Sequence, residues 1–164
     1  MVPSSYIEFM ITSAGAAGAM IGLLFVAISL RTDLVFSANA PARVRTLAGS
    51  SFTGLVNAFS LSLLAIIPST NIGVGMIVLA LACLYSTFQL HSRALGDTQY
   101  RVLALSTLNY LAQFAGGVTI LARPHTSWIV NGLCYIIFAS FVIALTRAWS
   151  LIRAESPTAP DASS

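Results

Sequence analysis

The sequence contains very little charge for its length. Asp, Glu, Lys and Arg make up 8% of its 164 residues, whereas hydrophobic residues make up 57%. A soluble domain carries roughly 25% charged residues, because water must wet its surface. The shortage of charge therefore excludes an ordinary water-exposed globule and indicates a chain whose surface faces lipid. Lysine is absent, and all eight cations are arginine.

The sequence is also poor in cysteine. Its two cysteines, Cys83 and Cys134, lie inside apolar runs and show no CxxC or other metal-type spacing. This excludes a disulfide framework, and we expect both to be buried thiols that behave as small hydrophobic side chains.

Five apolar stretches are long enough to cross a bilayer. A helix rises 1.5 Å per residue, so about 20 residues cross a hydrocarbon core of roughly 30 Å. Backbone groups in lipid must bond within their own segment, so these stretches should be helical. The predicted fold is an all-α membrane protein, a bundle of five transmembrane helices in one domain over residues 1–153, followed by a disordered cytoplasmic tail at 154–164. The expected spans are approximately Tyr6 to Leu30, Thr46 to Ile67, Ile72 to Leu90, Val102 to Leu121 and Trp128 to Ile152.

The arginines predict the orientation of this bundle, because cytoplasmic junctions are enriched in Lys and Arg. With five spans, seven of the eight arginines fall on one side and only Arg123 falls on the other. Omitting the polar second span would divide them evenly. We therefore expect the N-terminus outside and the C-terminus in the cytoplasm. The seven arginines then serve as topology determinants and inner-leaflet anchors: Arg31, Arg43, Arg45, Arg93, Arg101, Arg147 and Arg153.

Small residues recur at every fourth position of the first span. Ala14, Gly18 and Gly22 should form a flat face on which another helix approaches closely. The partner helix belongs either to the same chain or to another copy, and the sequence leaves this open.

The second and fourth spans share a pattern of polar residues spaced three, then four. In both helices this spacing places the residues on one face. Both spans run from inside to outside, so Asn57 and Gln113 should lie at similar depths. These faces either line a polar path for a small solute or form interhelical hydrogen bonds. The residues are Ser50, Thr53, Asn57 and Ser60 in the second span, and Ser106, Asn109 and Gln113 in the fourth.

No ionisable residue lies near the centre of any span, which argues against ion-coupled transport but not against passive conduction. Nearer the outer side are Glu8, Arg123 and His125. They form either an outer-face cluster or three separate interfacial residues.

Catalytic motifs are absent as well. The sequence has no HExxH, no GxSxG and no glycine-rich phosphate loop with lysine. His91 and His125 are expected on opposite sides of the bilayer and cannot share a site. We therefore predict no catalytic residues, no metal and no cofactor.

The stretch AGAAGAMIGLLFVAISLR, from Ala14 to Arg31, resembles the opening span of small uncharacterised bacterial integral membrane proteins. These begin with an Ala/Gly-rich turn followed by a GLLFVA-type run. The resemblance implies a multi-pass protein of the bacterial inner membrane. It implies no activity and assigns no functional residue.

The sequence favours a non-enzymatic membrane protein that acts through helix–helix contacts, as a subunit or regulator of a membrane assembly. Its expected partners are the lipid bilayer and either a second copy or another membrane protein. Nucleic acid is not expected, because the arginines flank apolar runs and form no basic patch with interleaved aromatics. The alternative is a passive channel or carrier for a small neutral solute, lined by the second and fourth spans.

Overall fold

The computed structural model describes residues 4–30, 42–68, 71–92, 97–123 and 128–153, and the secondary structure of these residues is helical. Five long helices follow one another along the chain. They are α1 (Ser4–Ser29), α3 (Ala42–Ile66), α4 (Ile72–Ser92), α5 (Asp97–Ala122) and α6 (Trp128–Arg153). The prediction of an all-helical chain with five helices is confirmed. Helix α5 begins five residues before the expected span, whereas the other helices start and end within four residues of theirs.

The helix boundaries follow local sequence signals. Helix α3 begins directly after Pro41 and ends two residues before Pro68, and proline is poorly tolerated inside a helix. Asn71 precedes α4, and its side-chain oxygen accepts a hydrogen bond from the backbone N–H of Val74 at 3.4 Å. This contact satisfies one of the unpaired N–H groups of the first turn, as is typical of an N-cap.

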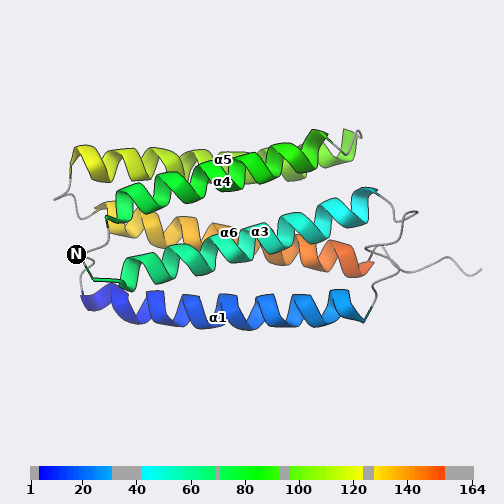
Figure 1. Ribbon diagram of the computed structural model, residues 1–164, viewed down its shortest axis with the longest axis horizontal. Helices are drawn as coiled ribbons and strands as arrows, with labels where there is room; N and C mark the ends of the chain where they lie inside the picture. The colour runs from blue at the N-terminus through cyan, green and yellow to red at the C-terminus, as the bar shows by residue number, and fades with distance from the viewer. Residues whose placement is uncertain (1–3, 31–41, 69–70, 93–96, 124–127, 154–164) are drawn as a thin grey trace, which may run out of the picture.

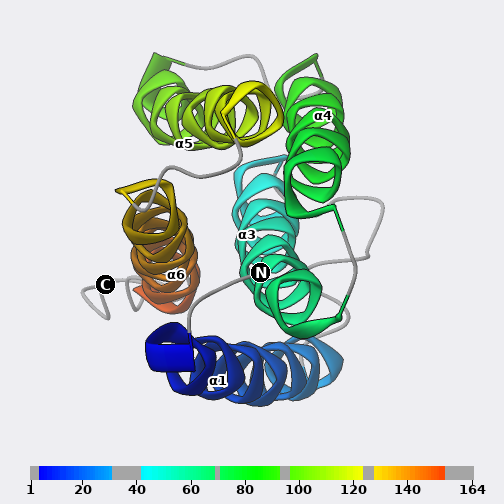
Figure 2. The same cartoon turned by 90° about the vertical axis from the view of Figure 1, so that its left-hand side faces the viewer.

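The helices run along one common axis and alternate in direction (Figure 1). Helices α4 and α5 form one layer, α3 and α6 the middle layer, and α1 the layer on the opposite side (Figure 2). The most extensive contacts join α4 to α5, α3 to α6, and α1 to α3. Helices α3 and α5 run in the same direction, as the sequence predicted. The end of the bundle at which α1 begins is called the first end below, and the opposite end the second end.

Two pairs of helices approach closely at small residues. A Cβ atom added at Gly73 of α4 would lie 2.9 Å from the carbonyl oxygen of Gly117 in α5, and one added at Gly117 would lie 2.8 Å from that of Gly73. Across α3 and α6, a Cβ atom at Gly54 would lie 3.2 Å from that of Ala144. Only glycine fits the first of these contacts without a shift of the backbone, so it sets the spacing between α4 and α5.

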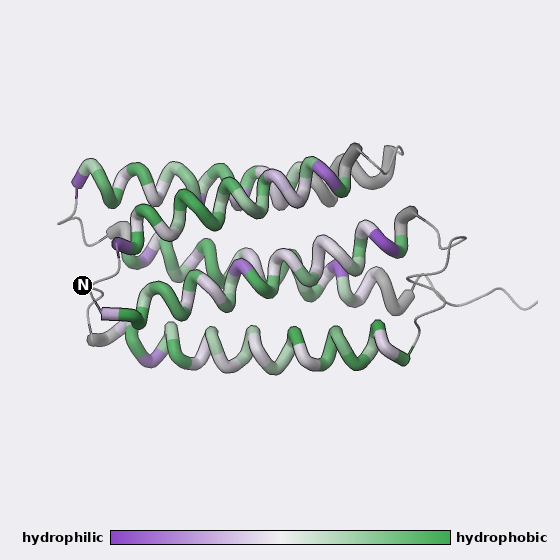
Figure 3. The backbone as a smooth tube through the Cα atoms, in the orientation of Figure 1, coloured by the Kyte–Doolittle hydropathy of each residue, from purple (hydrophilic) through white to green (hydrophobic). Residues whose placement is uncertain are grey.

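Four of the described helices, namely α1, α3, α4 and α6, are long and apolar enough to cross a membrane. Figure 3 shows hydrophobic residues along most of the length of the bundle. Helix α5 is equally long but does not belong to this group among the described residues. Its sequence includes Asn109 and Gln113, which lower its average hydropathy.

Candidate functional site

The centre of the bundle contains a reciprocal pair of side-chain amides. Asn57 of α3 donates from Nδ2 to Oε1 of Gln113 at 2.8 Å, and Gln113 of α5 donates from Nε2 to Oδ1 of Asn57 at 3.2 Å. Both side chains are 0% exposed. Because α3 and α5 have few backbone contacts, these two amides bridge helices that otherwise lie apart. Their direct contact shows that Asn57 and Gln113 lie at the same level of the bundle.

The amide pair is the middle of a network that reaches four helices. Gln113 also donates to the carbonyl oxygen of Met76 in α4 at 3.2 Å, and the Cys83 thiol donates to Asn57 at 3.6 Å. Asn57 makes a second, longer contact of 3.4 Å with the Ser140 hydroxyl of α6. Asn109 donates to the same hydroxyl at 2.9 Å, and that hydroxyl donates to its own helix at Ile136.

The hydrogen-bonding capacity of the two central amides is used within the protein. An amide offers two N–H donors and one oxygen with two lone pairs. Both donors of Asn57 and both donors of Gln113 have acceptors in the network, and each amide oxygen accepts at least one bond. A water or solute molecule that accepts a hydrogen bond from these amides would therefore have to displace an existing bond.

A second polar group lies nearer the second end. Arg147 of α6 is 4% exposed, and its guanidinium donates to the Ser106 hydroxyl of α5. Tyr110, one turn further along α5, is buried between Arg147 and Cys83. The predicted polar face of α5 is thus engaged along its whole length: Ser106 with Arg147, Asn109 with Ser140, and Gln113 with Asn57 and Met76.

The sequence prediction missed the burial of Arg147, and it also missed the part of Ser140 in the network. Arg147 was expected as an anchor in the inner leaflet, but it points into the bundle. A signal for this was present, because Arg147 follows Ser140 by seven residues. That spacing is two helical turns and places both residues on one face of α6.

The hydroxyl side chains of the polar face predicted on α3 bond mainly to the backbone of their own helix. Ser50 donates to the carbonyl oxygen of Leu47, and Thr53 donates to that of Gly49. Thr53 also contacts Ser86 of α4 at 3.3 Å, and Ser60 is half-buried. Short hydroxyl side chains bond readily to the preceding turn of their own helix, whereas the longer amide of Asn57 spans the gap to α5.

The small-residue face predicted on α1 divides between two surroundings. Ala14 is buried, and a Cβ atom at Gly18 would lie 3.7 Å from the Phe59 ring of α3. Gly22 is exposed, and a Cβ atom there would meet nothing within 4 Å. A spacing of four residues exceeds one turn of 3.6, so the stripe rotates away from α3 along the helix. Gly15, Ala19 and Gly22, spaced four and three, instead share an exposed face.

The structure describes only some of the charged residues that the sequence analysis singled out. Glu8 and Arg123 are both exposed, on α1 and at the end of α5, and these helices lie in opposite outer layers (Figure 2). The structure therefore does not bring Glu8 and Arg123 together, and His125 lies outside the described residues. Arg45 is exposed on α3. Arg31 and Arg93 lie outside the described residues, as does the tail at 154–164, and only the helical backbone is described at Arg43, Arg101 and Arg153.

Within the described residues, no group of three or more His, Cys, Asp or Glu side chains is placed to hold a metal ion. Cys83 and Cys134 are free thiols, the first buried and the second half-buried. No protein-family model, no curated protein and no solved structure matches this chain.

Proposed function

We propose that the chain is a five-span integral membrane protein, with its N-terminus outside and its C-terminus in the cytoplasm. Support comes from the distribution of polar and apolar side chains, which is the reverse of that in a soluble protein. The polar side chains of Asn57, Asn109, Gln113 and Arg147 lie inside the bundle. Large apolar side chains cover its outside, among them Leu23, Phe25, Phe88 and Phe138. Lipid accepts such a surface, whereas water would leave it unfavourably exposed.

We include α5 among the spans because its polar residues face inward. Asn109 and Gln113 are buried, whereas five large apolar residues of α5 are exposed. Its outward surface is therefore as apolar as that of its neighbours, and its lower average hydropathy reflects the polar core. The exposed residues are Leu105, Leu108, Leu111, Val118 and Leu121. With α5 included, seven of the eight arginines fall on the cytoplasmic side.

Within this placement, we propose a non-enzymatic role as a subunit or regulator of a bacterial inner-membrane assembly, acting through helix contacts. The observation that carries the proposal is that the central polar groups bond to one another, which leaves the outer surface of the bundle for interaction. On that surface, α1 presents Gly15, Ala19 and Gly22 to the outside. Small residues let another helix approach closely in lipid, where packing rather than the hydrophobic effect drives association.

The alternative of a passive channel is not favoured by this geometry. It requires the polar faces of α3 and α5 to be directed at a shared water-filled path. Instead, Asn57 and Gln113 bond directly to each other, and the Ser140 hydroxyl and the Met76 carbonyl complete the contact. A transported solute would have to open this network, so we propose that it stabilises the bundle.

Purification in mild detergent tests the proposed role. The native chain should co-elute with a partner membrane protein or a second copy, and Gly15→Leu and Gly22→Leu should abolish this. Neither leucine would meet described atoms near its Cβ, so the fold of the single chain should survive. Gly132→Leu on α6 is the matched control, because a Cβ atom there also meets nothing within 4 Å, and it should retain the partner. A native chain that elutes as a stable monomer with no partner would refute the proposed role.

A further inference from the structure

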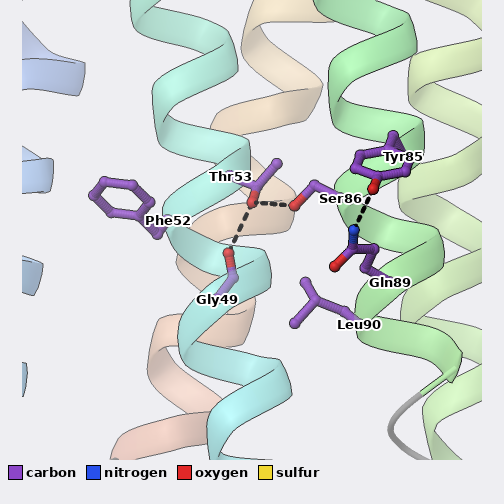
Figure 4. Close-up of a pocket in the computed structure, with 7 residues that line it drawn as sticks. All are labelled: Gly49, Phe52, Thr53, Tyr85, Ser86, Gln89 and Leu90. Atoms are coloured by element: carbon purple, nitrogen blue, oxygen red, sulfur yellow. Dashed lines mark hydrogen bonds between the residues drawn. The ribbon is translucent and has the colours of Figure 1, made fainter.

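A groove of about 380 Å³ opens between α3 and α4, away from the central polar network (Figure 4). Gly49, Phe52 and Thr53 line it from α3, and Tyr85, Ser86 and Gln89 line it from α4. Phe52 and Tyr85 are both exposed, so the groove lies on the outer surface of the bundle. Its volume is in the range typical of small-molecule sites.

The groove combines apolar walls with oxygen and nitrogen atoms, which is unusual on a surface that faces lipid. The Thr53 and Ser86 hydroxyls lie 3.3 Å apart across its floor. On the α4 side, Gln89 donates from Nε2 to the Tyr85 hydroxyl oxygen at 2.5 Å. That oxygen then acts as an acceptor, and the Tyr85 O–H can still donate to an acceptor of a ligand. Polar groups in contact with hydrocarbon are unfavourable unless hydrogen-bonded, so this surface suits a ligand that carries acceptor oxygens.

A cation lies close to the groove along α3. Arg45 is exposed and precedes Gly49 by four residues, which places the two on the same face of the helix about 6 Å apart along its axis. Helical side chains lean toward the N-terminus of their helix, so the long Arg45 side chain extends away from the groove toward the second end. With the proposed orientation, that end is the headgroup level of the cytoplasmic leaflet, where arginine attracts anionic lipid.

We propose that this groove binds an anionic phospholipid of the cytoplasmic leaflet. The phosphate lies at Arg45, an ester oxygen accepts from the Tyr85 hydroxyl, and an acyl chain covers Phe52. The proposal rests on the membrane placement given under Proposed function. A second helix is a poorer occupant than a lipid, because an apolar helix surface would cover these polar groups without bonding to them.

Native mass spectrometry of the full chain tests the site. The protein is purified in detergent, mixed with equal amounts of phosphatidylglycerol and phosphatidylcholine, and scored for each retained lipid. The native chain should retain phosphatidylglycerol in preference. Arg45→Gln should reduce that preference about fivefold, the effect expected for one arginine at a headgroup. Arg123→Gln, an exposed arginine at the first end, is the control and should leave it unchanged.

A second pair of variants tests the contribution of the Tyr85 hydroxyl to lipid binding. Tyr85→Phe should weaken retention of both lipids severalfold, because the ester oxygens lose a donor, whereas Tyr135→Phe on α6 should not. Both tyrosines are largely exposed, 66% and 74%, so neither change threatens folding. Equal retention of the two lipids by the native chain, or unchanged retention in both Arg45→Gln and Tyr85→Phe, would overturn the proposal.

These outcomes are separable from failure of the proposed function. Lipid retention is measured on the single chain in detergent, so loss of every protein partner leaves the assay intact. Conversely, a chain that keeps its partner but shows no lipid preference fails only the groove proposal.

Discussion

The reciprocal amide pair allows a direct test of how the bundle is held together. Asn57→Leu removes two donated and two accepted hydrogen bonds and leaves the buried Gln113 without its main partner. Leaving a buried polar group unsatisfied costs about 1–3 kcal/mol. Gln113→Leu likewise leaves the buried Asn57 amide without its main hydrogen-bond partner. In the double variant, both amides are replaced by apolar groups of similar size, and Ser140 keeps its bonds to Asn109 and Ile136.

The double variant should therefore be less destabilised than the sum of the single variants. Two interhelical hydrogen bonds at about 0.6–1 kcal/mol each give a coupling free energy of about 1.2–2 kcal/mol. The measurement is a double-mutant cycle on the free energy of unfolding in detergent micelles or bicelles. Free energies that add to within about 0.5 kcal/mol would refute the reasoning, because independent sites behave in that way.

A control cycle pairs Asn57→Leu with Asn131→Leu. Asn131 lies in the first turn of α6, nine residues before Ser140 and so about 13 Å from it along the helix. It accepts a hydrogen bond from the Tyr6 hydroxyl of α1, and Tyr6 is not among the partners of Asn57. The two substitutions should add, whatever each of them costs alone.

Three further outcomes are expected. Ser106→Ala should destabilise the fold by about 1–2 kcal/mol, because the buried Arg147 loses an acceptor, and chemical unfolding in detergent measures this. Gly117→Ala should lower the midpoint of thermal unfolding through overpacking worth about 1–3 kcal/mol, since its Cβ would lie 2.8 Å from the Gly73 carbonyl oxygen. Gly132→Ala should leave the midpoint unchanged, because its Cβ would meet nothing within 4 Å. Equal midpoints for the two variants would contradict the close contact. Reporter fusions at the C-terminus should be fluorescent with green fluorescent protein and inactive with alkaline phosphatase, and the reverse pattern would contradict the proposed orientation.

The sequence was sufficient to predict the helices and the common level of Asn57 and Gln113 within the bundle. Apolar length marks each helix, and the shared spacing around Asn57 and Gln113 marks a face on each of two helices. Periodicity identifies a face but not the neighbour that it meets. The contacts of Gln113 with Met76 and of Asn57 with Ser140 therefore depend on helix order, which the sequence pattern does not encode.

Two further features of the structure could not be predicted from the spacing of residues, each for a different physical reason. Arg147 sits near the end of an apolar run, where arginines commonly mark the membrane boundary, and only its register with Ser140 indicated burial. On α1, a small-residue spacing of four suggested one continuous face, but the helical repeat of 3.6 turned Gly22 away from α3. In both cases, the angular position of a residue around its helix determined its burial more than its residue type did.

The amide pair also determines the register of the bundle. Apolar helix surfaces are chemically similar along their length, and lipid offers no preference between one axial offset and the next. A slip of α5 by one turn, 5.4 Å, toward the first end would carry Gln113 from Asn57 to the level of Leu61, in an apolar cluster with Met76 and Ile137. The amide would find no side-chain partner in that cluster. One pair of complementary side chains thus favours a single vertical alignment, and the close contact of Gly73 with Gly117 favours the same one.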